Sequence, residues 1–280
     1  MINQLDEKRV RKLILMALKE DIGTGDITSK AIFAKSDISR AVIKSKDNGV
    51  LCGIEMVLYV YSLIDGRVSV SAMQRDGNKI SKGMIVCEIT GPTISLLSGE
   101  RTVLNFIQRM SGIATRTSNI VSMLGGAGIE ILDTRKTLPG FRYLDKYSVK
   151  TGGASNHRMG LYDMILIKDN HIQAAGGVGA SIERVRKKYG DKYKIEVEAK
   201  NLDQVQEAVD TGADIIMLDN MDMETMSKAA GIVSKRALIE VSGNVDEERI
   251  KELSLLEIDY ISIGALTHSV RAFDFSMEFL

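Results

Sequence analysis

The fold is decided by residues 193–220, which read YKIEVEAKNLDQVQEAVDTGADIIMLDN. Two short apolar runs, at 193–197 and 214–218, enclose a helical stretch at 202–211. A strand, a helix and a second strand in this order favour two parallel strands joined by a covering helix.

The same unit repeats through the second half of the chain. Further apolar runs lie at 129–132, 164–167, 237–241 and 260–263, and further helical stretches lie at 181–189 and 223–233. The last four runs recur every 21 to 23 residues, the length of one strand, one helix and two loops. We expect about six parallel strands, either in a barrel, complete or incomplete, or in an open doubly wound sheet. Periodicity alone does not separate these two architectures.

The first part of the chain has a mixed pattern. Helical stretches are expected at 6–19 and 54–64, alternating stretches typical of strands at 39–46, 67–73 and 84–90, and a long helix at 98–124. These features indicate a small α+β unit ahead of the strand and helix repeat.

The composition excludes several classes of protein. Lysine plus arginine equals aspartate plus glutamate at 37 each, so no overall charge attracts nucleic acid or anionic lipid. No apolar stretch approaches the ~20 residues that a membrane span requires, and no signal peptide is recognisable. Cys52 and Cys87 form no CxxC pair. We therefore expect a reduced, cytoplasmic protein without nucleic acid or membrane partners.

Polar residues follow each apolar run of the repeat. In chain order they are Asp133-Thr134-Arg135-Lys136, Lys168-Asp169-Asn170-His171, Glu198, Asp219-Asn220, Ser242-Gly243-Asn244 and Gly264-Ala265. The carboxyl ends of parallel strands meet at one edge of a sheet or barrel, so these residues are expected to share one pocket. The first two strands contribute cations, the next two carboxylates, and the last two small residues.

Each of these groups suits a phosphorylated sugar. Gly243 and Gly264 allow the backbone to approach a phosphate closely at the start of a helix. Lysine and arginine neutralise phosphate or carboxylate groups. Glu198 and Asp219 could hold Mg²⁺ or stabilise a developing positive charge. The donor-rich segment 147–161 adds positive charge through His157 and Arg158.

Several motifs together resemble the quinolinate phosphoribosyltransferase family. They occur in the family's order and span nearly the whole chain: EDIGTGDIT at 20–28, GERTVLN at 99–105, DTRKTLPGFR at 133–142, GGASNHRMGL at 152–161, LIKDNH at 166–171, EVE at 196–198, IMLDN at 216–220 and IGALTHS at 263–269. So many ordered matches are highly specific.

The resemblance implies a fold and an assembly. An N-terminal α/β sandwich domain is expected over residues 1–112, and an irregular, incomplete α/β barrel over 113–269. The tail, 270–280, is expected to return to the first domain. The implied assembly is a homodimer, in some members a hexamer, in which the N-terminal domain of one subunit covers the barrel of its partner.

The resemblance also implies a reaction and a cofactor. Quinolinate and 5-phosphoribosyl 1-pyrophosphate would give nicotinate mononucleotide, pyrophosphate and CO₂ in NAD biosynthesis, with Mg²⁺ as cofactor. Two anionic substrates need many positive charges in the pocket. As pyrophosphate leaves, C1 of the ribose gains positive charge, which a nearby carboxylate stabilises.

Individual roles follow from the matched motifs. Quinolinate would be held by Arg101 from the neighbouring subunit and by Arg135, His157, Arg158 and Lys168. Lys136 and Lys168 would face the pyrophosphate, and Glu198 and Asp219 would serve the ribose and Mg²⁺. The 5′-phosphate would be held by Ser242, Gly243 and Gly264, with His268 nearby. Lys136, Glu198 and Asp219 are the expected catalytic residues.

Three alternatives remain open from the sequence. A phosphoribosyltransferase-like protein associated with molybdenum transport shares the expected fold, although LIKDNH matches the quinolinate enzymes better. An aldolase could use Lys168 as a Schiff-base nucleophile. A non-catalytic protein could bind sugar phosphates with the same residues.

Overall fold

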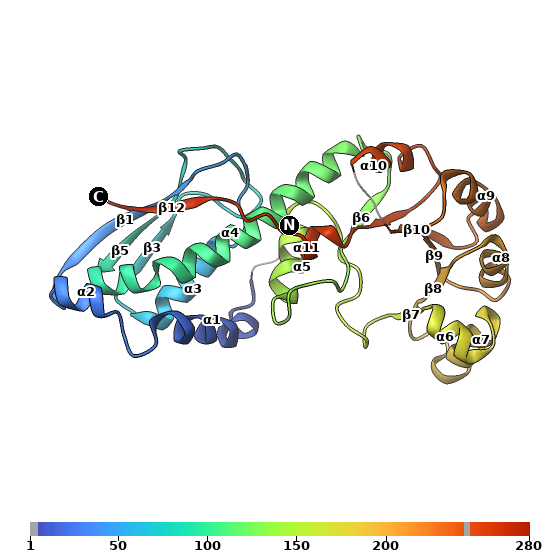
Figure 1. The fold of residues 1–280 in the computed structure, drawn as a ribbon, viewed down its shortest axis with the longest axis horizontal. Coiled ribbons are helices and arrows are strands. Elements are labelled where there is room, and N and C mark those ends of the chain that lie inside the picture. Colours follow the sequence, from blue (N-terminus) through green and yellow to red (C-terminus); the bar gives the residue numbers. More distant parts are fainter. Residues whose placement is uncertain (1–4, 244–246) are drawn as a thin grey trace. The chain divides into compact units, whose positions relative to one another are not determined.

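The computed structural model describes residues 5–243 and 247–280, and Figure 1 shows its ribbon. The chain divides into two compact units, each assembled from separate segments. The first unit contains Met1–Ser118, Thr137–Gly153 and Leu266–Leu280, and the second contains Asn119–Lys136 and Ala154–Ala265. The domain boundary expected at residues 112 and 113 stays a prediction.

The first unit is built on an antiparallel sheet with the strand order β12-β1-β5-β3. The strands are β1 (Ile38–Ser45), β3 (Ser69–Ala72), β5 (Ile85–Pro92) and β12 (Phe275–Phe279). A separate pair consists of β2 (Gly49–Val50) and β4 (Lys79–Ile80). The helices that begin in this unit are α1 (Glu7–Ile22), α2 (Ile27–Ile32), α3 (Ile54–Ile64), α4 (Thr93–Met123) and α5 (Arg142–Thr151).

The helices of this unit pack their apolar faces into one core. Helix α1 begins after Asp6, whose side chain accepts a hydrogen bond from the N–H of Lys8, and it buries Val10, Ile14 and Leu18 at intervals of four residues. Residue 112 of α4 is glycine because a Cβ there would lie 2.2 Å from the carbonyl oxygen of Arg271. The segment that leads into β12 therefore crosses α4 in direct backbone contact.

The second unit contains a parallel sheet with the strand order β6-β11-β10-β9-β8-β7 (Figure 1). Its strands are β6 (Glu130–Leu132), β7 (Ile165–Ile167), β8 (Ile195–Ala199), β9 (Ile215–Asp219), β10 (Leu238–Ser242) and β11 (Tyr260–Ser262). The helices are α6 (Asp169–Ala175), α7 (Val178–Tyr189), α8 (Leu202–Asp210), α9 (Met223–Val233) and α10 (Glu247–Leu253). The short helix α11 (Ala265–His268) begins at the last residue of this unit and otherwise belongs to the first.

The strand order decides between a barrel and an open sheet. Strands β7 to β11 are neighbours in sequence order, and β11 then pairs with β6, the first strand of the series. A doubly wound sheet would instead reverse its order at a switch point. The strands therefore follow one another around a barrel that is open between β6 and β7. The structure confirms an α/β fold with an antiparallel N-terminal sheet and an incomplete α/β barrel.

None of the helices in the described ranges has both the length and the apolar character of a membrane span.

Candidate active site

The carboxyl ends of β8, β9 and β10 lie at one edge of the parallel sheet. The register pairs Ser242 at the end of β10 with Asp219 at the end of β9, and Glu198 lies one residue before the end of β8. The structure thus brings these three predicted site residues to the same edge.

An ion pair joins two of the predicted residues at this edge. The Nζ atom of Lys168, which follows β7, lies 2.7 Å from Oε2 of Glu198, and the Glu198 side chain is only 10% exposed. Beside them, Lys200 Nζ and Asp169 Oδ2 form a second pair at 2.9 Å, and this hydrogen bond lowers the pKa of Asp169. Two cations and two carboxylates therefore lie together. Lys200 was not among the predicted residues, although it directly follows β8.

Asp219 is held by its neighbour Asn220. The Asn220 side chain donates to Asp219 Oδ1 at 2.9 Å, and the Asn220 N–H donates to the carbonyl oxygen of Ser242 at 3.2 Å. Position 243, directly after Ser242, is glycine for two reasons. Gly243 has φ 104°, and a Cβ there would lie 2.2 Å from Oδ1 of Asn220. Asn244, also named in the strand-end pattern, lies outside the described residues.

Asp133 organises the predicted binding segment 156–158. It follows β6 and is fully buried. Its Oδ1 accepts a hydrogen bond from the backbone N–H of His157 at 3.0 Å, and its Oδ2 accepts one from the Asn156 side chain at 2.7 Å. The predicted cation Arg158 is thereby fixed close to the end of β6. Asp133 was predicted only as part of a polar strand end.

Arg158 and Arg135 are neighbouring cations. Burial lowers the pKa of Arg158, and the Arg135 guanidinium lowers it further. Two like charges that are held close and partly out of water are stabilised by an anion between them. Lys136, the next residue after Arg135, is exposed, and its N–H donates to the Thr134 hydroxyl at 3.1 Å.

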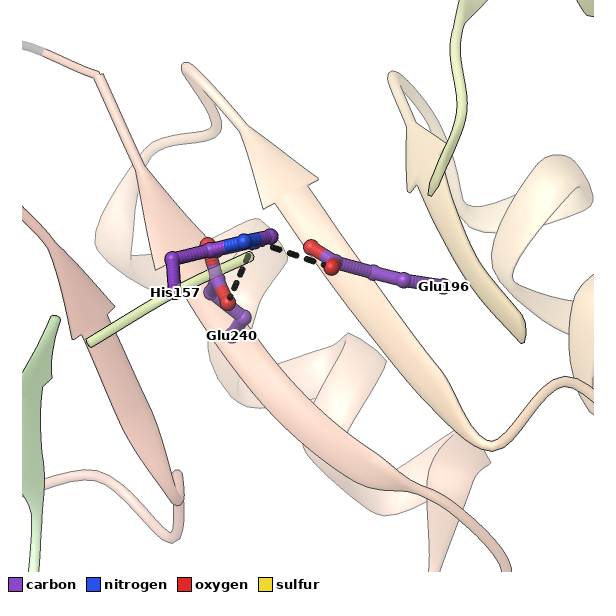
Figure 2. Close-up of side chains that lie close together, drawn as sticks. All are labelled: His157, Glu196 and Glu240. Carbon is purple, nitrogen blue, oxygen red and sulfur yellow. Dashed lines mark ion pairs between the residues drawn. The ribbon is translucent and has the colours of Figure 1, made fainter. Parts of the chain in front are cut away.

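The sequence did not predict a buried cluster of three ionisable residues, His157, Glu196 and Glu240 (Figure 2). The His157 Nε2 atom lies 3.0 Å from Oε2 of Glu196 on β8 and 3.7 Å from Oε2 of Glu240 on β10. These side chains are 7%, 0% and 1% exposed. Strand alternation could have revealed them, because Glu196 and Glu240 each lie two residues before a strand-end residue and so share its face.

Burial and the nearby Glu196 carboxylate change the titration of Glu240. Burial raises the pKa of Glu240 to about 7, and the Glu196 carboxylate raises it as well, whereas His157 and Lys168 oppose the shift. The folded protein therefore binds the Glu240 proton more tightly than the unfolded chain does.

This shift predicts a pH-dependent stability. The contribution of the Glu240 proton is fully present below the ordinary glutamate pKa of about 4.5 and is lost as pH rises through about 7. The free energy of unfolding should therefore fall by on the order of 2 kcal/mol more for the wild type than for Glu240→Gln between pH 5 and 8. Urea unfolding at several pH values measures the difference. Parallel curves for the two proteins would contradict it, and Glu207→Gln, on the outer helix α8, is the control.

Two of the predicted binding residues contact β8 at two levels. His157 contacts Glu196, and Lys168 contacts Glu198, two residues further along β8. Two residues of a strand span about 6.6 Å, so the two contacts are separated by roughly the length of a small dicarboxylate. His157 and Arg158 also line a cavity of about 560 Å³ together with Lys192 and Lys194, which precede β8.

Three predicted residues are not brought to this group by the structure of the second unit. Arg101 is an exposed residue of α4 in the first unit. His268 ends α11, also in the first unit, and its Nδ1 lies 2.7 Å from the Ser269 hydroxyl. Gly264 follows β11 and precedes α11. Their roles in the site stay predictions.

The incomplete parallel barrel with cations and carboxylates at its strand ends defines an enzyme that acts on anionic substrates. Two family models match the chain: the quinolinate phosphoribosyl transferase N-terminal domain over residues 26–111 and the C-terminal domain over 113–278. The chain is 41% identical to a probable nicotinate-nucleotide pyrophosphorylase (carboxylating) of Bacillus subtilis, over 98% of this chain and 94% of that protein. It is 40% identical to a mitochondrial quinolinate phosphoribosyltransferase (decarboxylating) of Nicotiana tabacum, over 98% and 82%.

Solved structures agree with these relatives. NadC from Streptococcus pyogenes superposes with a TM-score of 0.96 at 39% identity, over 99% of both chains. The nicotinate-nucleotide pyrophosphorylase of Francisella tularensis superposes with a TM-score of 0.94 at 36% identity, over 100% of this chain and 99% of that one. The chain belongs to the quinolinate phosphoribosyltransferase family.

Proposed function

We propose that the chain transfers the phosphoribosyl group of 5-phosphoribosyl 1-pyrophosphate to quinolinate, with loss of CO₂, and that the strand ends of the barrel carry the reaction. The products are nicotinate mononucleotide, pyrophosphate and CO₂, which makes the chain an enzyme of NAD biosynthesis. The observation that carries the proposed site is the contact between Lys168 and Glu198. It combines a cation for an anionic substrate with a shielded carboxylate for a positive reaction centre.

Quinolinate is proposed to bind among the positively charged side chains of residue 135 and of segment 157–168. Arg135 and Arg158 are close neighbours, so a carboxylate between them relieves their repulsion. Lys168, which contacts Glu198, is proposed to bind the second carboxylate of quinolinate. His157 belongs to the same group, and Arg101 is proposed to come from a second copy of the chain.

The phosphoribosyl group is proposed to bind at the ends of β9, β10 and β11. Glu198 and Asp219 face the ribose, and Lys136 faces the pyrophosphate. Ser242, Gly243 and Gly264 hold the 5′-phosphate, with His268 beside it. Gly243 has φ 104°, and a Cβ there would meet the Asn220 side chain, so only glycine fits this loop.

Magnesium is the proposed cofactor. Glu198 and Asp219 fit it, since carboxylate oxygens at a strand edge are the ligands that Mg²⁺ prefers. When bound, the ion offsets the negative charge of the departing pyrophosphate.

The chemistry follows from these positions. As the bond from C1 of the ribose to pyrophosphate breaks, C1 becomes positively charged, and the Glu198 carboxylate stabilises that charge. The quinolinate ring nitrogen then bonds to C1 and becomes a pyridinium nitrogen. The positive ring accepts the electron pair released when the 2-carboxylate leaves as CO₂, and a proton from solvent replaces it at C2.

The proposed assembly is a homodimer, or a hexamer built from three such dimers, in which subunits share sites. The proposed location is the cytoplasm, and the two buried free thiols, Cys52 and Cys87, agree with a reducing compartment.

Release of CO₂ from quinolinate labelled at the 2-carboxylate tests the function. We expect release only when 5-phosphoribosyl 1-pyrophosphate and Mg²⁺ are present, together with an equal amount of pyridine mononucleotide. Release without the phosphoribosyl donor would contradict the proposal. Binding of both substrates without any product would instead indicate a non-catalytic protein, and borohydride trapping of a substrate on Lys168 would indicate Schiff-base chemistry.

A further inference from the structure

We propose that Glu196 and Glu240 are positioning residues that hold the quinolinate-binding segment 156–158 in place through the imidazole of His157. The proposal rests on the proposed function, because it assigns that segment to quinolinate. Neither glutamate is placed at a strand end, and neither has a role in the steps described above.

Side chains on β8, on β10 and directly after β6 contact this segment. Asp133, after β6, binds its backbone through the N–H of His157 at 3.0 Å. Glu196 on β8 and Glu240 on β10 lie 3.0 Å and 3.7 Å from the Nε2 atom of the same residue (Figure 2). His157 is thus held from the main chain on one side and from the ring on the other. A segment without regular secondary structure gains a fixed position from such contacts.

The ring also connects the glutamates to Arg158. The backbone N–H of Arg158 donates to Nδ1 of His157 at 2.6 Å, so Nδ1 acts as an acceptor. A neutral imidazole with an accepting Nδ1 carries its proton on Nε2, and this atom lies 3.0 Å from Oε2 of Glu196, although the two are not aligned for a hydrogen bond. The chain of contacts therefore runs from a buried carboxylate of the barrel, through one imidazole, to the main chain of a proposed substrate-binding arginine.

The same three side chains could instead hold a metal ion, because their ligand atoms lie within 4.8 Å of one another. The hydrogen bond at Nδ1 favours the positioning role. A metal ion needs the Nε2 lone pair, and the proton would then have to lie on Nδ1, where the Arg158 N–H already points.

Substitutions at Glu196 test the proposal. Glu196→Met keeps the length of the side chain and removes the hydrogen-bond acceptor, whereas Glu196→Gln keeps an acceptor oxygen. We expect Glu196→Met to raise KM for quinolinate about tenfold, because the imidazole loses the carboxylate 3.0 Å from its Nε2 atom, with KM for the phosphoribosyl donor changed less than about threefold. Glu196→Gln should restore most of the wild-type KM. Glu207→Met and Glu207→Gln are the matched controls, because Glu207 accepts a backbone hydrogen bond on the outer helices.

A variant at the second glutamate guards against loss of folding in Glu196→Met. Glu240→Met removes the more distant carboxylate, so its effect on KM for quinolinate should have the same sign and be smaller, about threefold. An equal rise in both KM values, or an unchanged KM for quinolinate in Glu196→Met protein that folds, would overturn the proposal. One equivalent of a transition metal in the wild type, lost in Glu196→Met and measured by mass spectrometry, would also overturn it.

Hydrogen exchange gives a readout that does not depend on catalysis. The amide of Arg158 should exchange faster in Glu196→Met, by about tenfold, and at nearly the wild-type rate in Glu196→Gln. If the wild type released no CO₂ from quinolinate but this exchange pattern held, the proposed function would fail while the positioning contact stood. Unchanged exchange in both variants would reject the positioning contact itself.

Discussion

Replacing Glu198 with glutamine is expected to lower kcat by a factor of about 10² or more, the scale on which a preorganised charge contact contributes to catalysis. The Glu198 carboxylate is 90% shielded from solvent and lies 2.7 Å from Lys168. A neutral amide of nearly the same shape fills the same space, but it cannot offset the positive charge that develops at C1 of the ribose. The substitution also removes the negatively charged partner of Lys168.

The formation of pyridine mononucleotide at saturating concentrations of both substrates measures this effect. Glu207→Gln, an equivalent substitution on the outer helix α8, should leave kcat unchanged. If Glu198→Gln retained kcat within about a factor of three of the wild type, the carboxylate would not face the reaction centre. The proposal that β8 contributes a residue to the active site would then be wrong.

The second large effect is expected at Arg101. Arg101→Ala should raise KM for quinolinate by about 10². Alanine provides neither the positive charge nor the two hydrogen bonds through which an arginine binds a carboxylate. The value of kcat should change much less, since the arginine is proposed to bind the substrate and not to act on C1.

Mixing the two variants at a quinolinate concentration below the wild-type KM, where Arg101→Ala has little activity, tests whether Arg101 comes from a partner. In a heterodimer of Arg101→Ala and Lys136→Ala subunits, one site receives both intact residues and the other receives neither. Random exchange in an equal mixture should therefore restore about a quarter of the wild-type activity. If labelled subunits exchanged and no activity returned, each site would be formed within a single chain.

Local sequence patterns were sufficient to predict the strands of the barrel. Short apolar runs separated by helical stretches predicted β8, β9 and β10 within a few residues, because parallel strands buried on both faces are almost continuously apolar. The choice between an incomplete barrel and a doubly wound sheet could not be made in the same way. It depends on the pairing of β11 with β6, and these strands are more than a hundred residues apart in the chain.

Of the helices in the described ranges, α2, α5, α6, α10 and α11 were not predicted. Residues 142–151 form α5, although no helix was predicted in the donor-rich segment 147–161, which includes its second half. Residues 169–175 form α6 directly after Lys168, so the polar strand end is also a helix start. In α5 and α6 tertiary packing supports a short helix with few aliphatic residues.

The predicted site was incomplete for a related reason. The polar residues at strand ends predict a pocket that includes Glu198 and Asp219. Glu196 and Glu240 lie inside strands, where a charged residue is normally costly, and the contact with His157 accounts for both of them. Contacts between distant strands are not visible in the sequence pattern of either strand.

The loop after β10 limits how the enzyme can be altered by directed evolution. Any side chain at position 243 would collide with the Asn220 amide that holds Asp219, and the positive φ disfavours it as well. A library that varies position 243 alone should yield almost only glycine among active clones. Larger residues should be recovered only with a shorter residue at 220, so the two positions should be randomised as a pair.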